Sequence, residues 1–150
     1  MHTYASALAL SGITVPAHLV ADATVPVLSG PQAQGDLLLL PVPSLPGAAW
    51  TRLPADGLQV VKGEATGNTH WLHEGFDSPG VRWAPSGGGL RVGYVLVPDG
   101  QSALLIHTDE HGANGIGPGT YAVQRKRAQA VMVEYRAARQ VSDDTYLVED

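Results

Sequence analysis

The chain has 150 residues, no cysteine, and a net charge of −5 from nine basic and fourteen acidic side chains. The length fits one domain that buries a core without cross-links, and the lack of cysteine excludes disulfides, zinc–thiolate sites and iron–sulfur clusters. The acidic balance argues against general nucleic-acid binding, which needs clustered positive charge. Only 15% of the residues are charged, and eighteen glycines with eleven prolines favour short strands joined by turns.

The N-terminal region shows no targeting signal. No run approaches the ~18 apolar residues of a membrane span. The first basic residue is Arg52, so the start of the chain lacks the positive charge of a secretory signal. We therefore expect a cytoplasmic protein that does not bind membranes.

Residues 1–34 differ in composition from the rest of the chain. They hold one charged side chain, Asp22, and three prolines, which disfavour a long helix or a central strand. Because this segment is more apolar than a typical disordered chain, two interpretations stay open. It is either a partly ordered tail or an extended arm that lies along the domain or a neighbouring subunit. The expected organisation is an arm over 1–34, a β domain over 35–142 and an acidic tail over 143–150.

Short apolar runs between turn residues predict the strands of the β domain. The predicted strands are 36–42, 58–64, 68–73, 81–83, 91–97, 102–107 and 120–125. A Pro-Asp-Gly turn at 98–100 predicts a hairpin that joins two of them, and glycine-rich loops are predicted over 85–89 and 107–119. Residues 128–141 fit either a strand or a helical turn. About seven short strands predict an all-β fold, namely a small barrel, jelly roll or sandwich.

Four of the six histidines form two groups, His70 with His73 and His107 with His111. Imidazole is the commonest protein ligand for transition metals, and strands near 70 and 107 can be neighbours in an antiparallel sheet. Residues three apart on a strand point to opposite faces, so His70 and His73 cannot both be ligands on a regular strand. We favour His70 because it follows a Thr-Gly-Asn turn, from which the loop can aim it inward. The predicted ligands of a divalent metal (Zn, Fe, Ni or Mn) are His70, His107 and His111.

Two carboxylates complete the predicted site. Glu64 or Glu110 is expected to act as a fourth ligand or as a proton carrier, with metal-bound water acting on a small polar substrate. The alternative is that these histidines are ordinary surface or hydrogen-bonded residues. The segment His107-Thr-Asp-Glu-His111 also matches the inverted zinc-peptidase pattern, which requires both histidines on one face of a helix.

Four motifs in a fixed order give the chain a resemblance. They are Gly35-Asp-Leu-Leu38, Gly63-Glu-Ala-Thr-Gly-Asn-Thr-His70, His107-x-x-x-His111-Gly and Pro118-Gly-Thr-Tyr121. The order resembles a family of short, uncharacterised bacterial β-proteins over about residues 35–127. The resemblance implies that His70, His107 and His111 belong to one shared pattern, and it implies no activity.

The layout is also distantly similar to the cupins, which are small metal-binding barrels. Cupins place a His pair and a Glu on one hairpin and a further His on a later strand. Here Asn68 stands where a cupin has the first His of that pair, and His107 and His111 form a pair where a cupin has one His. The similarity favours a barrel with an internal site.

Two non-catalytic functions compete with the metal hypothesis. One is a structural or assembly protein that forms symmetric homo-oligomers through the arm over 1–34. The other is an adaptor that binds an acidic partner through the basic edge from Arg125 to Arg139. The sequence identifies neither a protein partner nor a small-molecule substrate.

Overall fold

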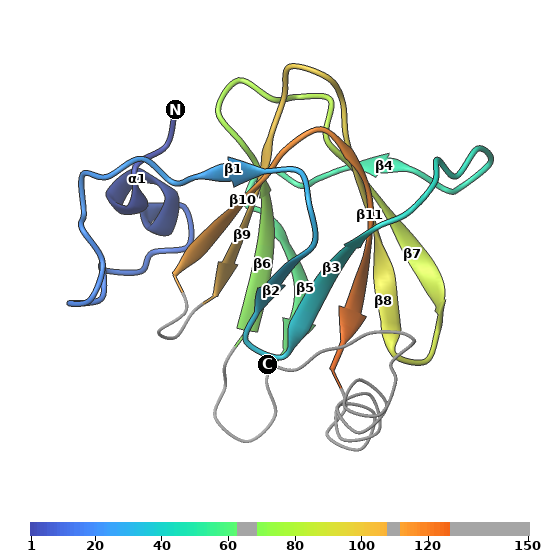
Figure 1. Cartoon of the computed structure of the whole chain (residues 1–150), viewed down its shortest axis with the longest axis horizontal. Helices are drawn as coiled ribbons and strands as arrows, with labels where there is room; N and C mark the ends of the chain where they lie inside the picture. Colours follow the sequence, from blue (N-terminus) through green and yellow to red (C-terminus); the bar gives the residue numbers. More distant parts are fainter. Residues whose placement is uncertain (63–68, 108–111, 127–150) are drawn as a thin grey trace, which may run out of the picture.

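The structure, a computed structural model, describes residues 1–62, 69–107 and 112–126, which form two β-sheets packed face to face (Figure 1). The five-stranded sheet has the order β1-β10-β9-β6-β5, and the six-stranded sheet has the order β2-β3-β11-β8-β7-β4. The elements are α1 (Tyr4–Ala9), β1 (Val27–Leu28), β2 (Gln32–Gln34), β3 (Leu37–Pro41), β4 (Thr51–Arg52), β5 (Leu58–Lys62), β6 (Thr69–Glu74), β7 (Arg82–Gly88), β8 (Arg91–Val97), β9 (Ala103–His107), β10 (Ala113–Ile116) and β11 (Gly119–Arg125). The predicted all-β class is confirmed, and the architecture is the sandwich.

The main core lies between the two sheets. Alternate residues of each strand point inward, as the two-residue period of a strand requires. Leu37, Leu39, Leu72, Leu105 and Tyr121 are at most 1% exposed and belong to one apolar cluster. Burial of this cluster away from water is the main force that holds the sheets together.

The predicted hairpin at Pro98-Asp-Gly100 is wrong. The turn itself is present, because Gln101 N–H donates to the Pro98 carbonyl oxygen at 3.1 Å and Gly100 has a φ of 78°. However, β8 pairs with β7 and β11, whereas β9 pairs with β6 and β10. The turn therefore carries the chain from one sheet to the other.

Two predicted glycine-rich loops contain strands. Residues 85–88 continue β7, with a register irregularity between Pro85 and Gly88, after which Gly88 still pairs with Arg91 of β8. Within 107–119, β10 pairs with β9 on one side and with β1 on the other. A Cβ at Gly115 would lie 2.3 Å from the Pro26 carbonyl oxygen, so the glycine permits the close approach of β1.

The segment before residue 35 lies against the domain of its own chain (Figure 1). Helix α1 begins at a capping box formed by Thr3 and Ser6. Ala7 and Leu8 are fully buried in a second apolar cluster with Leu104 and Ile106 of β9. The arm thus covers the outer face of the five-stranded sheet. In the part of the chain that the structure describes, no helix has the length and apolar character needed to cross a membrane.

The Pro118-Gly-Thr-Tyr121 motif has a structural role. The buried Tyr121 hydroxyl donates to the carbonyl oxygens of Gly117 and Pro118 at 2.9 and 3.1 Å. Gly119 has a φ of 146°, a region that favours glycine. The motif therefore fixes the turn into β11.

Candidate functional site

His70 and His107 lie opposite each other inside the sandwich. His70 is the second residue of β6 and His107 is the last residue of β9, and the two are register partners. Their ring centroids are 4.3 Å apart, and the side chains are buried at 1% and 3% exposure. The two histidines that were predicted to meet are therefore neighbours at one end of the inner sheet face.

Gln34 of β2 orients the ring of His70. The Gln34 amide nitrogen donates to the Leu105 carbonyl oxygen at 2.7 Å and to Asn114 Oδ1 at 2.9 Å. Because the nitrogen is fixed by two acceptors, the amide oxygen faces His70 Nδ1 at 3.0 Å. An amide oxygen only accepts hydrogen bonds, so His70 carries a proton on Nδ1.

Asp36 lies on the other side of the His70 ring. Its Oδ1 atom is 3.1 Å from His70 Nε2, and its side chain is 65% exposed. Nδ1 already carries a proton, so in a neutral imidazole Nε2 has a lone pair. That lone pair would face the carboxylate oxygen, and the two would repel each other. The contact is favourable when a positive centre, either a proton or a metal ion, is held at Nε2.

His73 lies on the opposite face of the same strand. Its register partner is Leu104, and its Nε2 atom is 3.1 Å from Ser11 Oγ of the arm. Burial lowers the pKa of His73, the nearby His2 lowers it further, and Asp56 opposes the shift. His73 is thus separated from the His70–His107 pair by the sheet, as the two-residue period predicts.

Three predicted site residues lie outside the described residues: His111, Glu64 and Glu110. In residues 1–62, 69–107 and 112–126, no group of three or more His, Asp and Glu side chains converges closely enough to hold a metal ion. The backbone ends of the segment that contains His111 are joined, because His107 N–H donates to the Gly112 carbonyl oxygen at 2.9 Å.

The helical zinc-peptidase interpretation is wrong. That pattern needs His107 on a helix, but His107 ends strand β9 and pairs with His70.

Sequence reasoning missed Gln34 and Asp36. Gln34 falls in the arm over 1–34, and no periodicity or motif distinguishes it from Gln32. Asp36 stands inside the Gly35-Asp36 motif, which was available as a signal. Its contact with a histidine 34 residues further along the chain depends on the packing of the two sheets.

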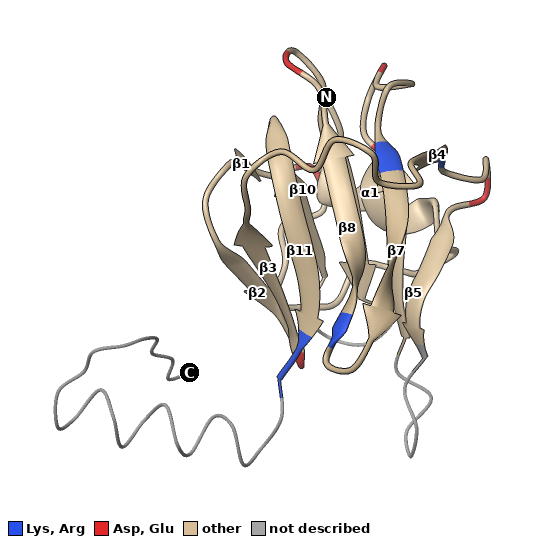
Figure 2. Ribbon diagram, turned by 90° about the vertical axis from the view of Figure 1, so that its right-hand side faces the viewer, with Lys and Arg blue, Asp and Glu red and all other residues tan. Residues whose placement is uncertain are grey.

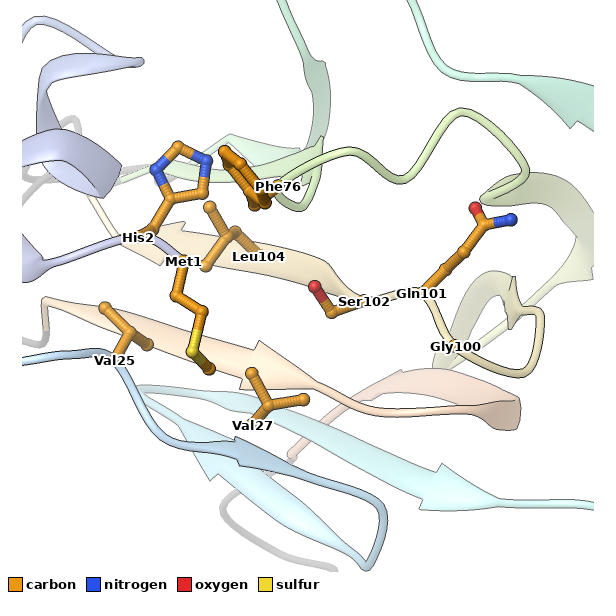
Figure 3. A pocket seen from close by; sticks show the side chains of 9 residues that line it. All are labelled: Met1, His2, Val25, Val27, Phe76, Gly100, Gln101, Ser102 and Leu104. Carbon is orange, nitrogen blue, oxygen red and sulfur yellow. The ribbon is translucent and has the colours of Figure 1, made fainter.

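The structure also has a surface cavity (Figure 3). Its volume is about 280 Å³, and Met1, His2, Val27, Phe76, Ser102 and Leu104 contribute to its lining. The rings of His2 and Phe76 lie nearly perpendicular to each other in an edge-to-face contact, with their centroids 6.4 Å apart. Burial and the N-terminal charge lower the pKa of His2. The lining contains neither His70 nor His107.

These features define an all-β protein of the two-sheet class with a buried histidine pair at one end. The chain belongs to the family described as "Domain of unknown function (DUF8820)", which matches residues 33–126. The matched region begins in β2 and ends directly after β11, so it includes Gln34, Asp36, His70 and His107. No curated protein and no solved structure matches the chain. The predicted membership of an uncharacterised family is confirmed.

Proposed function

We propose that the protein binds a divalent transition metal ion through His70 and His107, with His111 as a third ligand. The observation that supports this proposal is the contact between His70 Nε2 and Asp36 Oδ1 at 3.1 Å beside the facing ring of His107. Transition-metal bonds to His nitrogen and Asp oxygen are about 2.0–2.2 Å long, so two ligand atoms on one metal lie about 3 Å apart. The separation therefore suits two atoms that share one ion.

The hydrogen bond from His70 Nδ1 to Gln34 also supports metal binding. A histidine ligand commonly donates its other ring N–H to an oxygen acceptor, which fixes the tautomer and leaves a lone pair for the metal. Gln34 supplies that acceptor from a side chain that is 3% exposed and held by Leu105 and Asn114. Nε2 then lies on the side of the ring that faces the exposed Asp36 carboxylate.

The chemistry beyond binding stays a prediction. Glu64 or Glu110 would serve as a further ligand or as the proton carrier for metal-bound water, acting on a small polar substrate. The likeness to cupins is a prediction of the same kind. The assembly function also stays a prediction, although the arm packs on its own sheet in this structure.

Metal content measured on purified protein tests the proposal. We expect a near-stoichiometric amount of Zn, Fe, Ni or Mn in tag-free protein prepared without chelator. The variants His70→Ala, His107→Ala and His111→Ala should each lose it, whereas His18→Ala, which changes an exposed histidine, should retain it. Circular dichroism of each variant would show that the fold is intact.

Two results would reject the metal function. One is an unchanged metal content in all three histidine variants. The other is wild-type protein without metal whose melting temperature does not rise when any of these ions is added, because a ligand that binds the native state must stabilise it.

A further inference from the structure

The outer face of the six-stranded sheet is apolar across three adjacent strands. Ala122 of β11 pairs with Leu40 of β3 and with Tyr94 of β8, and Thr120 pairs with Leu96. These side chains alternate with the inward-facing core residues, so they share the outer face. Ala122 is fully buried, while Leu40, Tyr94 and Leu96 are partly exposed.

Strands that are apolar on both faces are normally covered on both faces. Strand β9 fits this rule, since the core covers one face and the arm covers the other, and all five of its residues are buried. Strands β3 and β8 are similarly apolar, reading Leu-Leu-Leu-Leu-Pro and Arg-Val-Gly-Tyr-Val-Leu-Val. Figure 2 shows their outer face with no helix or strand of the described residues across it.

The charged side chains of these strands are all basic. Strands β3, β11, β8 and β7 contain no Asp or Glu. The guanidinium carbon of Arg91 lies 5.7 Å from the centroid of the Tyr94 ring. Arg91 begins β8 at the end of the sheet where β11 ends, and its guanidinium donates to Gln124 Oε1 at 3.4 Å. Gln124 alternates with the inward-facing Val123, so both side chains belong to the outer face.

The chain after Lys126 has the composition that complements such a face. Residues 143–150 read Asp-Asp-Thr-Tyr-Leu-Val-Glu-Asp, with three apolar residues between two pairs of carboxylates. An extended segment of this length covers about 25 Å at ~3.3 Å per residue, which matches a seven-residue strand. Residues 127–142 provide the connection from β11, which is itself a central strand of this sheet.

We propose that residues 143–150 bind across the outer face of β3, β11 and β8. In this arrangement Tyr146 and Val148, which share one side of an extended segment, cover Leu40, Tyr94 and Leu96, and a flanking pair of carboxylates lies near Arg91. The C-terminal segment then covers the six-stranded sheet as the N-terminal arm covers the five-stranded sheet. The interaction is independent of the proposed metal site on the inner face.

A spin label on the full-length chain tests this interaction. The chain has no cysteine, so Thr145→Cys gives a single labelling site that leaves the three apolar residues intact. We expect the label to broaden the backbone amide signals of Leu40, Ala122 and Tyr94 in NMR spectra. A label at His18→Cys on the arm should leave these signals sharp.

Charge dependence provides the second measurement. Raising the salt from about 0.1 M to about 1 M shortens the Debye length from about 10 Å to about 3 Å, and the broadening should decrease. Arg91→Glu should decrease it further, whereas Arg52→Glu, which changes an arginine paired with Glu74, should leave it unchanged.

Two outcomes would overturn the proposal. In the first, the label at position 145 broadens no signal on β3, β8 or β11. In the second, the broadening persists when isotope-labelled protein without the spin label is mixed with spin-labelled protein at natural abundance. The face would then be covered by a second copy of the chain.

Discussion

At the residue scale, the amide of Gln34 determines which nitrogen of His70 carries a proton. The amide nitrogen donates to Leu105 and Asn114, so its oxygen must accept from His70 Nδ1. This arrangement directs Nε2 towards Asp36. Gln34 therefore orients the ring of His70, the proposed ligand, although Gln34 itself is not a proposed ligand.

Replacement of Gln34 by leucine tests this positioning. We expect the affinity for Zn²⁺, measured by calorimetric titration, to fall about 10–100-fold, as for other partners that orient a ligating histidine. Gln32→Leu is the matched control, since Gln32 bonds to Leu28, Gly115 and Asn114 but does not touch His70. Equal losses of affinity in both variants would show that Gln34 acts only through general stability.

His73 makes a second residue-scale prediction, which concerns pH. Its folded pKa is lowered below the ordinary value of 6.5, mainly by burial. The unfolded chain therefore binds a proton more readily, so this contribution to stability is present above pH 6.5 and is lost as the pH falls below it. We expect His73→Gln to weaken the pH dependence of the unfolding free energy between pH 7 and pH 5, measured by urea denaturation.

The matched control for this pH effect is His18→Gln, which replaces an exposed histidine. It should leave the pH dependence as in the wild type. A wild-type slope in the His73→Gln variant would show that His73 does not cause the acid destabilisation.

The sequence predicts part of the site, and the missing part has a physical explanation. The two-residue strand period and the turn before His70 are local properties, and they indicated that His70 and His73 face opposite sides, with His70 aimed inward. The expected pairing of the strands near 70 and 107 then placed His70 near His107. The roles of Gln34 and Asp36 arise from contacts between β2, the β2–β3 turn and the opposite sheet. Such contacts depend on how the sheets pack, which residue patterns along one strand do not encode.

At the element scale, the turn at Pro98–Gly100 shows what a local signal can establish. Pro and Gly predict that the chain reverses, and it does so. They do not determine whether the next strand joins the same sheet, because that choice depends on the hydrogen-bonding partners of both strands. The same limit explains β10, which the sequence predicted as part of a glycine-rich loop. The segment forms a strand because it pairs with β1 on one side and with β9 on the other.

Helix α1 and its C-cap residue offer a matched pair of leucines for an element-scale prediction. Leu8 is fully buried against the sheet, whereas Leu10 is 43% exposed. We expect Leu8→Ala to lower the free energy of unfolding by about 2–5 kcal/mol because it leaves a cavity. Leu10→Ala should change it by less than about 0.5 kcal/mol, as measured by chemical denaturation. Equal effects would mean that the helix does not pack as described.

At the scale of the whole molecule, the protein is a sandwich with its N-terminal arm on one outer face. The arm buries Leu104 and Ile106, which would be exposed on the sheet without it. Exposed apolar faces promote association. The arm therefore has a role within one chain, and this role is distinct from the predicted function of joining subunits.

Light scattering on the full chain and on a chain that lacks residues 1–24 separates these two roles. If the arm only covers its own sheet, the full chain should have the mass of one chain. The shortened chain should then bind more of an apolar dye and unfold at a lower denaturant concentration. A full-length oligomer that dissociates to single chains on shortening would instead support the assembly function.

The proposed metal site is tested most directly by NMR of the histidine ring nitrogens during titration with Zn²⁺. We expect His70 to keep its proton on Nδ1 while its Nε2 resonance moves to the position of a metal-bound nitrogen at one equivalent of zinc, together with a ring nitrogen of His107. If both nitrogens of His70 are protonated at neutral pH and neither histidine responds to zinc, the contact with Asp36 is an ion pair, and the metal function is rejected.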